Sequence, residues 1–324
     1  MNIDLVYLWC DGGEPGYRRR LTTALAKAQN LDINARSPAR WLNNDELKFS
    51  LRSAERFMPW VRRIFIVTDG QTPKWLNSAN PRVTIVDHKK IIPKKYLPLF
   101  NSAAIEMFIA NIPELAEHFI YANDDMFAGA PLEPEFFFDA KGNPIVDVKR
   151  KRWRHDIYTD LGFARALAAE KKIFVRWFIR MNRLAFEVFG RKFSLICEHQ
   201  MEAMRKSYLQ DTLSRPGIKE VAEHTRRARF RDEFILQRIL LPLADNALGR
   251  NTLRIRRRPS WLRRLLPYHV DTLVVVPRNP AKLVLKRKPK LFCINDDEYT
   301  TDKQRGQNAL LLQQLFPDKS SFEK

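Results

Sequence analysis

Three polar residues, Asn123-Asp124-Asp125, directly follow a short apolar run from Phe119 to Ala122. Such a run predicts a buried β-strand, and in open α/β sheets ligands bind beyond the carboxyl ends of the strands. Two adjacent carboxylates at such a point repel each other unless a cation or strong hydrogen-bond donors lie beside them. Oxygen ligands of this kind suit Mg²⁺ or Mn²⁺, which also bind phosphate oxygens. The motif therefore predicts a metal-bound diphosphate site, and a ligand-free Asn-Asp-Asp turn is the open alternative.

Other strand candidates in the first third of the chain also end in acidic residues. Apolar runs at 3–9, 64–68 and 83–86 are followed by Asp11, Asp69 and Asp87. Helical patterns at 43–58 and 101–112 alternate with these runs, which predicts a largely parallel sheet covered by helices. The carboxyl ends of parallel strands meet at one edge, so the acids are expected to converge there. This convergence favours the metal site over the simple turn.

The composition points to anionic partners without choosing among them. The chain has 324 residues, with 57 Lys and Arg against 37 Asp and Glu, a formal charge of +20 and a pI near 10.0. Nucleic acid, acidic lipid, a phosphorylated polymer and a nucleotide donor all fit this balance. The 3 cysteines are far apart and show no metal-knuckle spacing, which favours a reducing compartment. Without a signal-peptide pattern or an apolar stretch of spanning length, the expected location is the cytoplasm.

The middle of the chain is basic and helical in pattern. Residues 163–192 predict one long helix or two, with cationic residues at helical spacing: Arg165, Lys172, Arg176, Arg180 and Arg183. Two interpretations stay open, an ordinary surface helix and a helix that lies peripherally on the anionic inner face of a membrane. A second basic cluster at 254–264, with Trp261 inside it, favours a surface that meets anions. Later patterns predict helices at 196–213, 230–243 and 300–316 and strands at 273–276, 283–285 and 291–294.

Four sequence blocks occur in a fixed order along the chain. The first runs from Asp4 to Gly12, and the second spans Asn44 to Asp125 in several close segments. The third combines Glu198-His199-Gln200-Met201 with Arg229-Phe230-Arg231-Asp232, and the fourth is Phe292-Cys293-Ile294-Asn295-Asp296-Asp297. Together they resemble the Stealth proteins, a group that includes bacterial capsule polymerases and the lysosomal-enzyme N-acetylglucosamine-1-phosphotransferase. The chain departs from the family pattern at Glu14, where an Asp is usual, and in lacking a Pro after His199.

The resemblance implies a fold and an activity. The fold would be α/β, a glycosyltransferase-A-like Rossmann-type core with a mostly parallel sheet and a basic helical insertion. Residues 1–140 would form the nucleotide-sugar-binding core, 141–195 the insertion, and 196–324 the rest of the catalytic domain. The activity would be transfer of a hexose 1-phosphate, such as N-acetylglucosamine 1-phosphate, from a nucleotide-sugar to a hydroxyl of a polysaccharide or other glycan acceptor. The reaction forms a phosphodiester and releases a nucleoside monophosphate, in capsule or exopolysaccharide synthesis.

Such a transfer needs a clamp on the diphosphate, a base for the acceptor hydroxyl and positive charge on the transferred phosphoryl group. Asp124 and Asp125 are the expected ligands of Mg²⁺ or Mn²⁺, and Asp124 is counted among the catalytic residues. His199 is the candidate general base, because imidazole titrates near neutral pH. Arg231 is the candidate phosphoryl clamp, since guanidinium binds phosphate oxygens in pairs. Glu106 is also counted among the candidate catalytic residues, because placement within the family implies a contact with the donor sugar.

The expected substrate-binding residues come from the strand ends and the first helices: Asp4, Asp11, Gly12, Arg52, Asn101 and Asn123. Several of them have a structural alternative. Asp4 lies at the far end of its strand, Asn101 is a suitable helix cap, and Arg52 shares the non-apolar face of its helix.

The sequence alone leaves two other functions open. A conventional glycosyltransferase would attack the anomeric carbon with much the same carboxylates and would release a nucleoside diphosphate. A basic nucleic-acid-binding protein would explain the charge, but no recognised binding module is present and the predicted strand ends are acidic. No specific nucleic-acid partner is therefore expected.

Overall fold

The structure, a computed structural model, describes residues 1–27, 42–230, 237–255, 272–275, 280–296 and 300–324. Two predicted features lie wholly outside these ranges: Arg231, the candidate phosphoryl clamp, and Trp261 of the second basic cluster.

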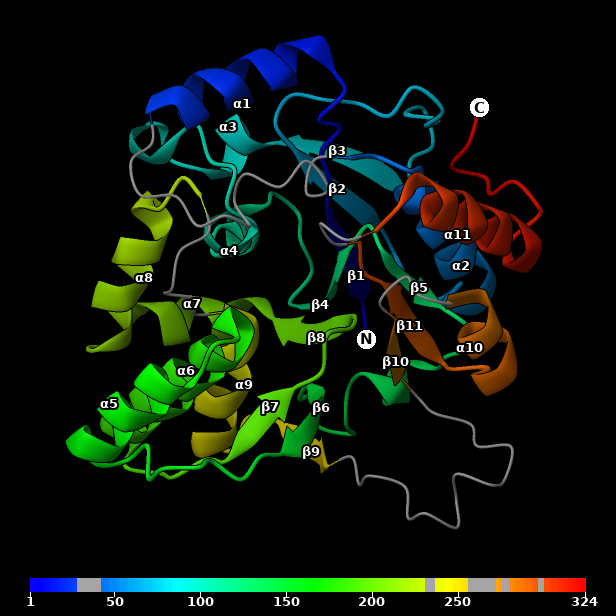
Figure 1. Cartoon of the computed structure of the whole chain (residues 1–324). Helices are drawn as coiled ribbons and strands as arrows, with labels where there is room; N and C mark the ends of the chain where they lie inside the picture. The colour runs from blue at the N-terminus through cyan, green and yellow to red at the C-terminus, as the bar shows by residue number, and fades with distance from the viewer. Residues whose placement is uncertain (28–41, 231–236, 256–271, 276–279, 297–299) are drawn as a thin grey trace.

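A five-stranded sheet in the order β3-β2-β1-β4-β8 forms the centre of the molecule (Figure 1). Its strands are β1 (Ile3–Leu8), β2 (Ile64–Thr68), β3 (Val83–Asp87), β4 (His118–Asn123) and β8 (Glu202–Arg205). The first four are parallel, and β8 runs antiparallel to β4. All residues of β1 and β2 are buried, as expected for strands that are covered on both faces. The predicted α/β class with a mostly parallel sheet is confirmed.

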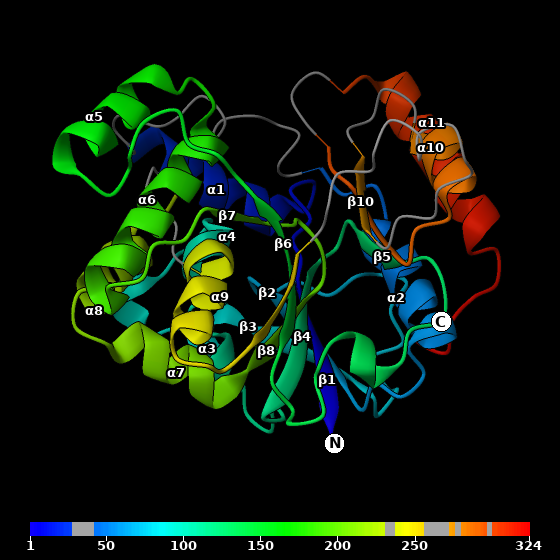
Figure 2. The same ribbon diagram turned by 90° about the horizontal axis from the view of Figure 1, so that it is seen from below.

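Alternate residues of β1 face two different helical layers, seen on the two sides of the sheet in Figure 2. Leu5 and Tyr7 pack in one apolar cluster with α2 (Glu46–Phe57), whereas Val6 and Leu8 belong to a second cluster. Helices that contribute to this second cluster are α3 (His88–Ile91), α4 (Ser102–Glu106), α6 (Ile173–Phe189), α7 (Lys206–Ser214), α8 (Ile218–Arg227) and α9 (Gln237–Ala247). Helix α1 (Pro15–Lys27) follows β1. Short 3₁₀ turns lie at Lys94–Tyr96, Ile109–Asn111 and Pro134–Phe136.

Two small sheets flank the main one. The first has the order β10-β11-β5, from β10 (Thr272–Val275), β11 (Leu291–Ile294) and β5 (Met126–Ala128). Helices α10 (Pro280–Arg287) and α11 (Asp302–Leu315) lie on its side of the molecule together with α2 (Figure 2). The second sheet has the order β7-β6-β9, from β6 (Ile145–Arg150), β7 (Leu195–Cys197) and β9 (Thr252–Ile255). The predicted insertion at 141–195 therefore shares a sheet with the later segment 252–255.

Several predicted elements differ in the structure. The pattern at 196–213 predicted one helix, but β7, a loop and β8 come first and only α7 is helical. The predicted strand at 283–285 is wrong, because these residues lie within α10. The helix predicted at 101–112 is broken into α4 and a 3₁₀ turn. At 196–213 and 283–285 the short apolar pattern fits both helix and strand, so it does not decide between them.

The basic middle region forms two helices, α5 (Asp160–Ala169) and α6. The buried side of α6, which includes Val175, Trp177 and Ile179, packs in the protein interior. Farther along the same helix, Arg183 forms ion pairs with Asp160 and Glu187. Among the described residues, no helix combines the length and the apolar character needed to cross a membrane.

Candidate active site

Asp124 and Asp125 form the turn between β4 and β5. Helix α2 is bonded to β5 at two points: the Ser50 hydroxyl donates to the Met126 carbonyl, and the Ala128 amide donates to Ser53 Oγ at 3.1 Å. These contacts fix the middle of α2 against β5, and Glu46, the first residue of the helix, lies near Asp124.

Four carboxylates gather at this point, and we call Glu46, Asp124, Asp125 and Asp296 the acidic cluster. Burial, then the nearby Glu46 and then Asp125 raise the pKa of Asp124 well above its usual value. Burial also raises the pKa of Glu46, and Asp296 adds to this rise. Glu46 and Asp296 line a shared small pocket, in which Arg305 Nε donates to Asp296 at 2.8 Å. The cluster thus concentrates negative charge around Asp124 that a bound cation would relieve.

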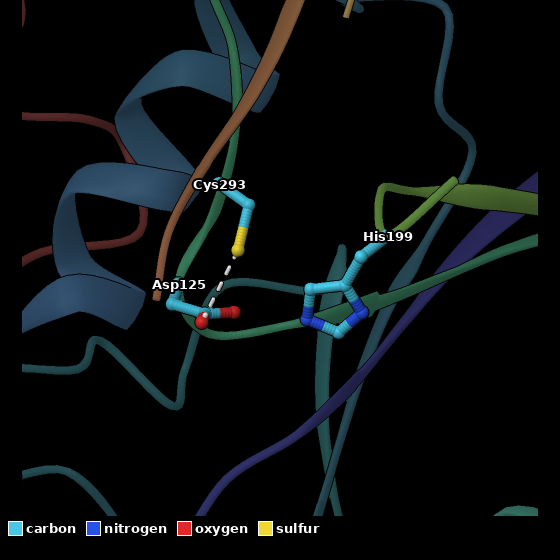
Figure 3. A group of neighbouring side chains, drawn as sticks. All are labelled: Asp125, His199 and Cys293. Atoms are coloured by element: carbon cyan, nitrogen blue, oxygen red, sulfur yellow. Dashed lines mark hydrogen bonds between the residues drawn. The ribbon is translucent and has the colours of Figure 1, made fainter. Parts of the chain in front are cut away.

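His199 reaches the same place from the other side. Because β8 pairs antiparallel with β4 and Glu202 lies opposite Tyr121, the loop before β8 lies at the carboxyl end of β4. Strand β11 pairs with β5 so that Cys293 lies opposite Met126, and the Ile294 amide donates to the Asp125 carbonyl at 3.0 Å. Ligand atoms of Asp125, His199 and Cys293 all lie within 4.8 Å of one another (Figure 3). These three side chains are close enough to hold a metal ion.

Asp147 on β6 holds the His199 loop on both sides of the imidazole. Its carbonyl accepts from the Glu198 amide at 3.1 Å, and its carboxylate accepts from Gln200 Nε2 at 2.7 Å. Arg254 donates to both carboxylate oxygens, at 2.6 and 3.0 Å, which balances the charge of this almost fully buried acid. One residue of the basic cluster at 254–264 therefore has a structural partner, and 256–264 lie outside the described residues.

Glu106 is buried behind the turn. The Tyr121 hydroxyl lies 2.7 Å from both Glu106 Oε1 and Asn123 Oδ1. One hydroxyl carries one proton, so it donates to one of these oxygens, and an amide flip would let Asn123 Nδ2 donate to the hydroxyl instead. Through Tyr121, Glu106 positions Asn123 next to the turn formed by Asp124 and Asp125, which we call the acidic turn.

Asn101 is a buried helix cap and also an anchor for the third sequence block. Its Oδ1 accepts from the Ala103 amide at 3.2 Å, and its Nδ2 donates to the Ala228 carbonyl at 3.1 Å. The Phe100 amide donates to the Arg229 carbonyl at 3.0 Å, and the rings of Phe100 and Phe230 stack with centroids 5.6 Å apart. These contacts hold the chain up to the residue before Arg231 against the start of α4.

Asp11 lies beyond the carboxyl end of β1, the strand next to β4. Its Oδ1 accepts from the Gly13 amide at 2.9 Å, and the side chain of Gln71 bonds to its backbone amide and carbonyl. Burial raises the pKa of the neighbouring Cys10 to about 12, with Asp124 and then Asp11 adding to the rise. Asp11 and Gly12 therefore lie at the same edge as the acidic turn.

The structure does not bring Asp4 and Arg52 to this edge. Asp4 is fully buried at the amino end of β1, where both oxygens accept from Arg62, at 2.9 and 2.7 Å. Arg52 donates to both carboxylate oxygens of Glu323 at 2.7 Å and so fastens the C-terminal segment to α2. These contacts replace the substrate contacts predicted for both residues.

Four residues of this site were not among the predicted site residues: Glu46, Asp147, Cys293 and Asp296. The second Asn-Asp-Asp motif, after the strand at 291–294, was the available signal for the last two, since it repeats the pattern at 123–125.

Comparisons with known proteins relate the chain to polysaccharide enzymes. Residues 40–146 match the model of Stealth protein CR2, conserved region 2. An exopolysaccharide phosphotransferase of Streptomyces coelicolor is 34% identical over 99% of this chain and 52% of its own length. The capsular polysaccharide phosphotransferase LcbA of Neisseria meningitidis is 46% identical over 43% of this chain and 38% of its own length. The chain thus spans about half the length of the curated relatives that match it throughout.

Among solved structures, the galactosyltransferase LgtC in complex with donor and acceptor sugar analogs aligns with 98% of this chain and 96% of its own. The TM-score is 0.45 and the identity 10%, which is a distant likeness. By its second conserved region and by its relatives over nearly all of its length, the chain belongs to the Stealth family.

Proposed function

We propose that this protein transfers a sugar 1-phosphate from a nucleotide-sugar to a hydroxyl of a polysaccharide acceptor and releases a nucleoside monophosphate. The observation that carries the proposal is the meeting of the Asp124-Asp125 turn with His199 at the carboxyl edge of the sheet. Relatives named exopolysaccharide and capsular polysaccharide phosphotransferases support the same class of reaction.

The carboxylates of the turn fit a hard divalent cation. Asp124 and Asp125 offer oxygen ligands, and the pKa of Asp124 is raised first by burial and then by the crowding of like charge. Asp124 and Asp125 would hold Mg²⁺ or Mn²⁺. When bound, the ion would supply positive charge to the donor diphosphate and to the departing nucleotide.

His199 would serve as the general base. The acceptor oxygen attacks the phosphorus that bears the sugar, and its proton passes to the imidazole. The bond from this phosphorus to the bridging oxygen breaks, so the nucleoside monophosphate leaves with the electron pair. Asp147 would hold the imidazole in place through Glu198 and Gln200, because near-attack geometry governs the rate of such a step.

The donor would lie along the edge formed by Asp11, Gly12 and Asn123. Gly12 has no side chain and leaves room for close approach of a ligand to the backbone. Asn123, held through Tyr121 by Glu106, presents an amide next to the turn. Arg231 stays the predicted clamp on the transferred phosphoryl group, and peripheral contact with an anionic membrane stays a prediction.

The test is to identify the nucleotide product. The purified protein is incubated with a panel of nucleotide-sugars, Mg²⁺ and an acceptor oligosaccharide, and the products are separated and weighed by mass spectrometry. We expect a nucleoside monophosphate together with an acceptor that gains a phosphodiester. A nucleoside diphosphate with a simple glycoside would contradict the proposal and support glycosyl transfer.

Replacement of the base gives a second test of the same proposal. His199→Ala should lower kcat by on the order of 10²–10⁴, while donor affinity measured by calorimetry largely survives. His224→Ala, in α8, is the matched control and should keep the wild-type rate. Equal turnover in His199→Ala would remove the general-base role.

A further inference from the structure

Asp125, His199 and Cys293 present three different ligand types from three separate segments. They come from the β4–β5 turn, the loop between β7 and β8, and β11 (Figure 3). The Cys293 thiol donates to Asp125 Oδ2 at 3.3 Å, and all three ligand atoms lie within 4.8 Å of one another. Cys293 is fully buried, whereas Asp125 and His199 are half-buried. An ion can therefore reach the triad from the side of Asp125 and His199.

The spacing of these atoms is close to that of a tetrahedral zinc site. With bonds of about 2.0–2.3 Å, two ligands of tetrahedral Zn²⁺ lie roughly 3.3–3.6 Å apart. The sulfur–oxygen distance of 3.3 Å already has this value, and atoms that lie up to 4.8 Å apart need to close by roughly 1.2–1.5 Å. The imidazole stands on a loop, where a small side-chain rotation supplies such a shift.

The ligand types separate this triad from the oxygen pair proposed for Mg²⁺. Thiolate and imidazole favour Zn²⁺ and similar ions, whereas Mg²⁺ takes oxygen ligands almost exclusively. We infer that Asp125, His199 and Cys293 form a site for Zn²⁺, with water in the fourth position. On binding, the Cys293 thiol releases one proton to solvent, and its thiolate bonds to the ion.

The site has a consequence for turnover that rests on the proposed function. Zn²⁺ would occupy a nitrogen of His199, the proposed base, and an oxygen of Asp125, a proposed Mg²⁺ ligand. Both groups would then be lost to the reaction. Zn²⁺ is therefore expected to inhibit the enzyme in the presence of excess Mg²⁺.

Cobalt spectroscopy tests the site without reference to activity. The untagged, chelator-treated full chain is titrated with Co²⁺, which replaces Zn²⁺ and reveals bound thiolate through a charge-transfer band in the near ultraviolet. We expect one equivalent to produce this band, Zn²⁺ to remove it and excess Mg²⁺ to leave it. Absence of the band in the wild-type protein would overturn the inference.

Two serine variants identify the sulfur. Cys293→Ser should remove the band and weaken Zn²⁺ binding by at least about tenfold in a competition assay. Cys197→Ser, a second buried thiol on a strand, is the matched control and should keep both. Persistence of the band in folded Cys293→Ser would overturn the assignment, as would its loss in Cys197→Ser alone.

An inhibition assay separates the two proposals. The Zn²⁺ concentration that halves turnover should rise at least about tenfold in Cys293→Ser, measured against each variant's own uninhibited rate. If phosphoryl transfer is absent but the cobalt band appears, the proposed function fails and the zinc site stands. If turnover occurs but no band forms, the zinc site fails and the function stands.

Discussion

The two edges of the main sheet both bury carboxylates, but they surround them differently. At the amino edge, both oxygens of Asp4 accept from Arg62 and one also accepts from the Ala116 amide at 2.7 Å. At the carboxyl edge, Asp124 lies beside Glu46 and Asp125, and its pKa is raised well above the usual value. At the amino edge, Arg62 neutralises the charge of Asp4, so this acid stabilises the fold. At the carboxyl edge, negative charge accumulates and lowers the stability of the fold. This arrangement is expected of a cation-binding site.

The largest predicted effect is on turnover at the carboxyl edge. Asp124→Asn should lower kcat by on the order of 10²–10³, because one charged oxygen ligand is lost where charge develops on the leaving group. The metal-free variant should unfold at the same denaturant concentration as the wild type, or a higher one, since the crowding of like charge is relieved. A kcat of Asp124→Asn equal to that of the wild type would contradict the catalytic role that distinguishes the carboxyl edge from the amino edge.

A buried histidine near the carboxyl end of β3 should make the fold sensitive to acid. His88 begins α3 just beyond β3, and burial lowers its pKa from 6.5 to about 4. Its neutral form is favoured in the folded state, so stability present above pH 6.5 is lost as the pH falls toward about 4. The loss is on the order of 3 kcal/mol, measurable by urea unfolding at several pH values.

His88→Gln should remove most of that pH dependence. His118→Gln, at the amino end of β4, is the control and should remove less, because His118 is only partly buried. An unchanged pH dependence in His88→Gln would assign the acid sensitivity elsewhere.

At the amino edge the expected change is in stability rather than in rate. Asp4→Asn should lower the free energy of unfolding by about 2–3 kcal/mol, less than for a fully buried pair because 34% of the Arg62 side chain is exposed. Turnover per folded molecule should stay at the wild-type level. A fall in kcat without loss of stability would return Asp4 to the substrate site.

The smallest predicted effect concerns the loop that carries the imidazole. Asp147→Asn should lower kcat by about 10–100-fold with little change in KM, because the side-chain contacts to Gln200 and Arg254 weaken and the His199 loop is held less firmly. The pH–rate profile should shift as well, which a purely structural defect would not cause. Asp211→Asn, which breaks the ion pairs to Arg215 and Arg250, is the control expected to lose stability but keep kcat. Equal kcat losses in the two variants would show that Asp147 has no special link to the base.

The strands and the acidic edge could be predicted because the information is local. Continuous apolar runs at 64–68 and 119–122 identify buried strands, and parallel strands necessarily bring their carboxyl ends together. Asp11, Asp124 and Asp125 follow from that rule alone.

The rest of the site depends on pairings between distant segments. Cys293 meets Asp125 across 168 positions, because β11 pairs with β5. Strand β8 is only four residues long and takes its form from β4, so the pattern around it predicted a helix. The Arg254–Asp147 contact, which supports the His199 loop, likewise spans 107 positions and has no local signal.

Measuring Mn²⁺ binding by variants of the two edges tests most directly whether the carboxyl edge holds a cation. The loss of the free Mn²⁺ signal in electron paramagnetic resonance reports binding to the wild type, Asp124→Asn and Asp4→Asn, each first confirmed as folded by circular dichroism. The proposed cation site predicts binding of one Mn²⁺ in the wild type and in Asp4→Asn, and loss of this binding in Asp124→Asn. Undiminished Mn²⁺ binding by folded Asp124→Asn would contradict it.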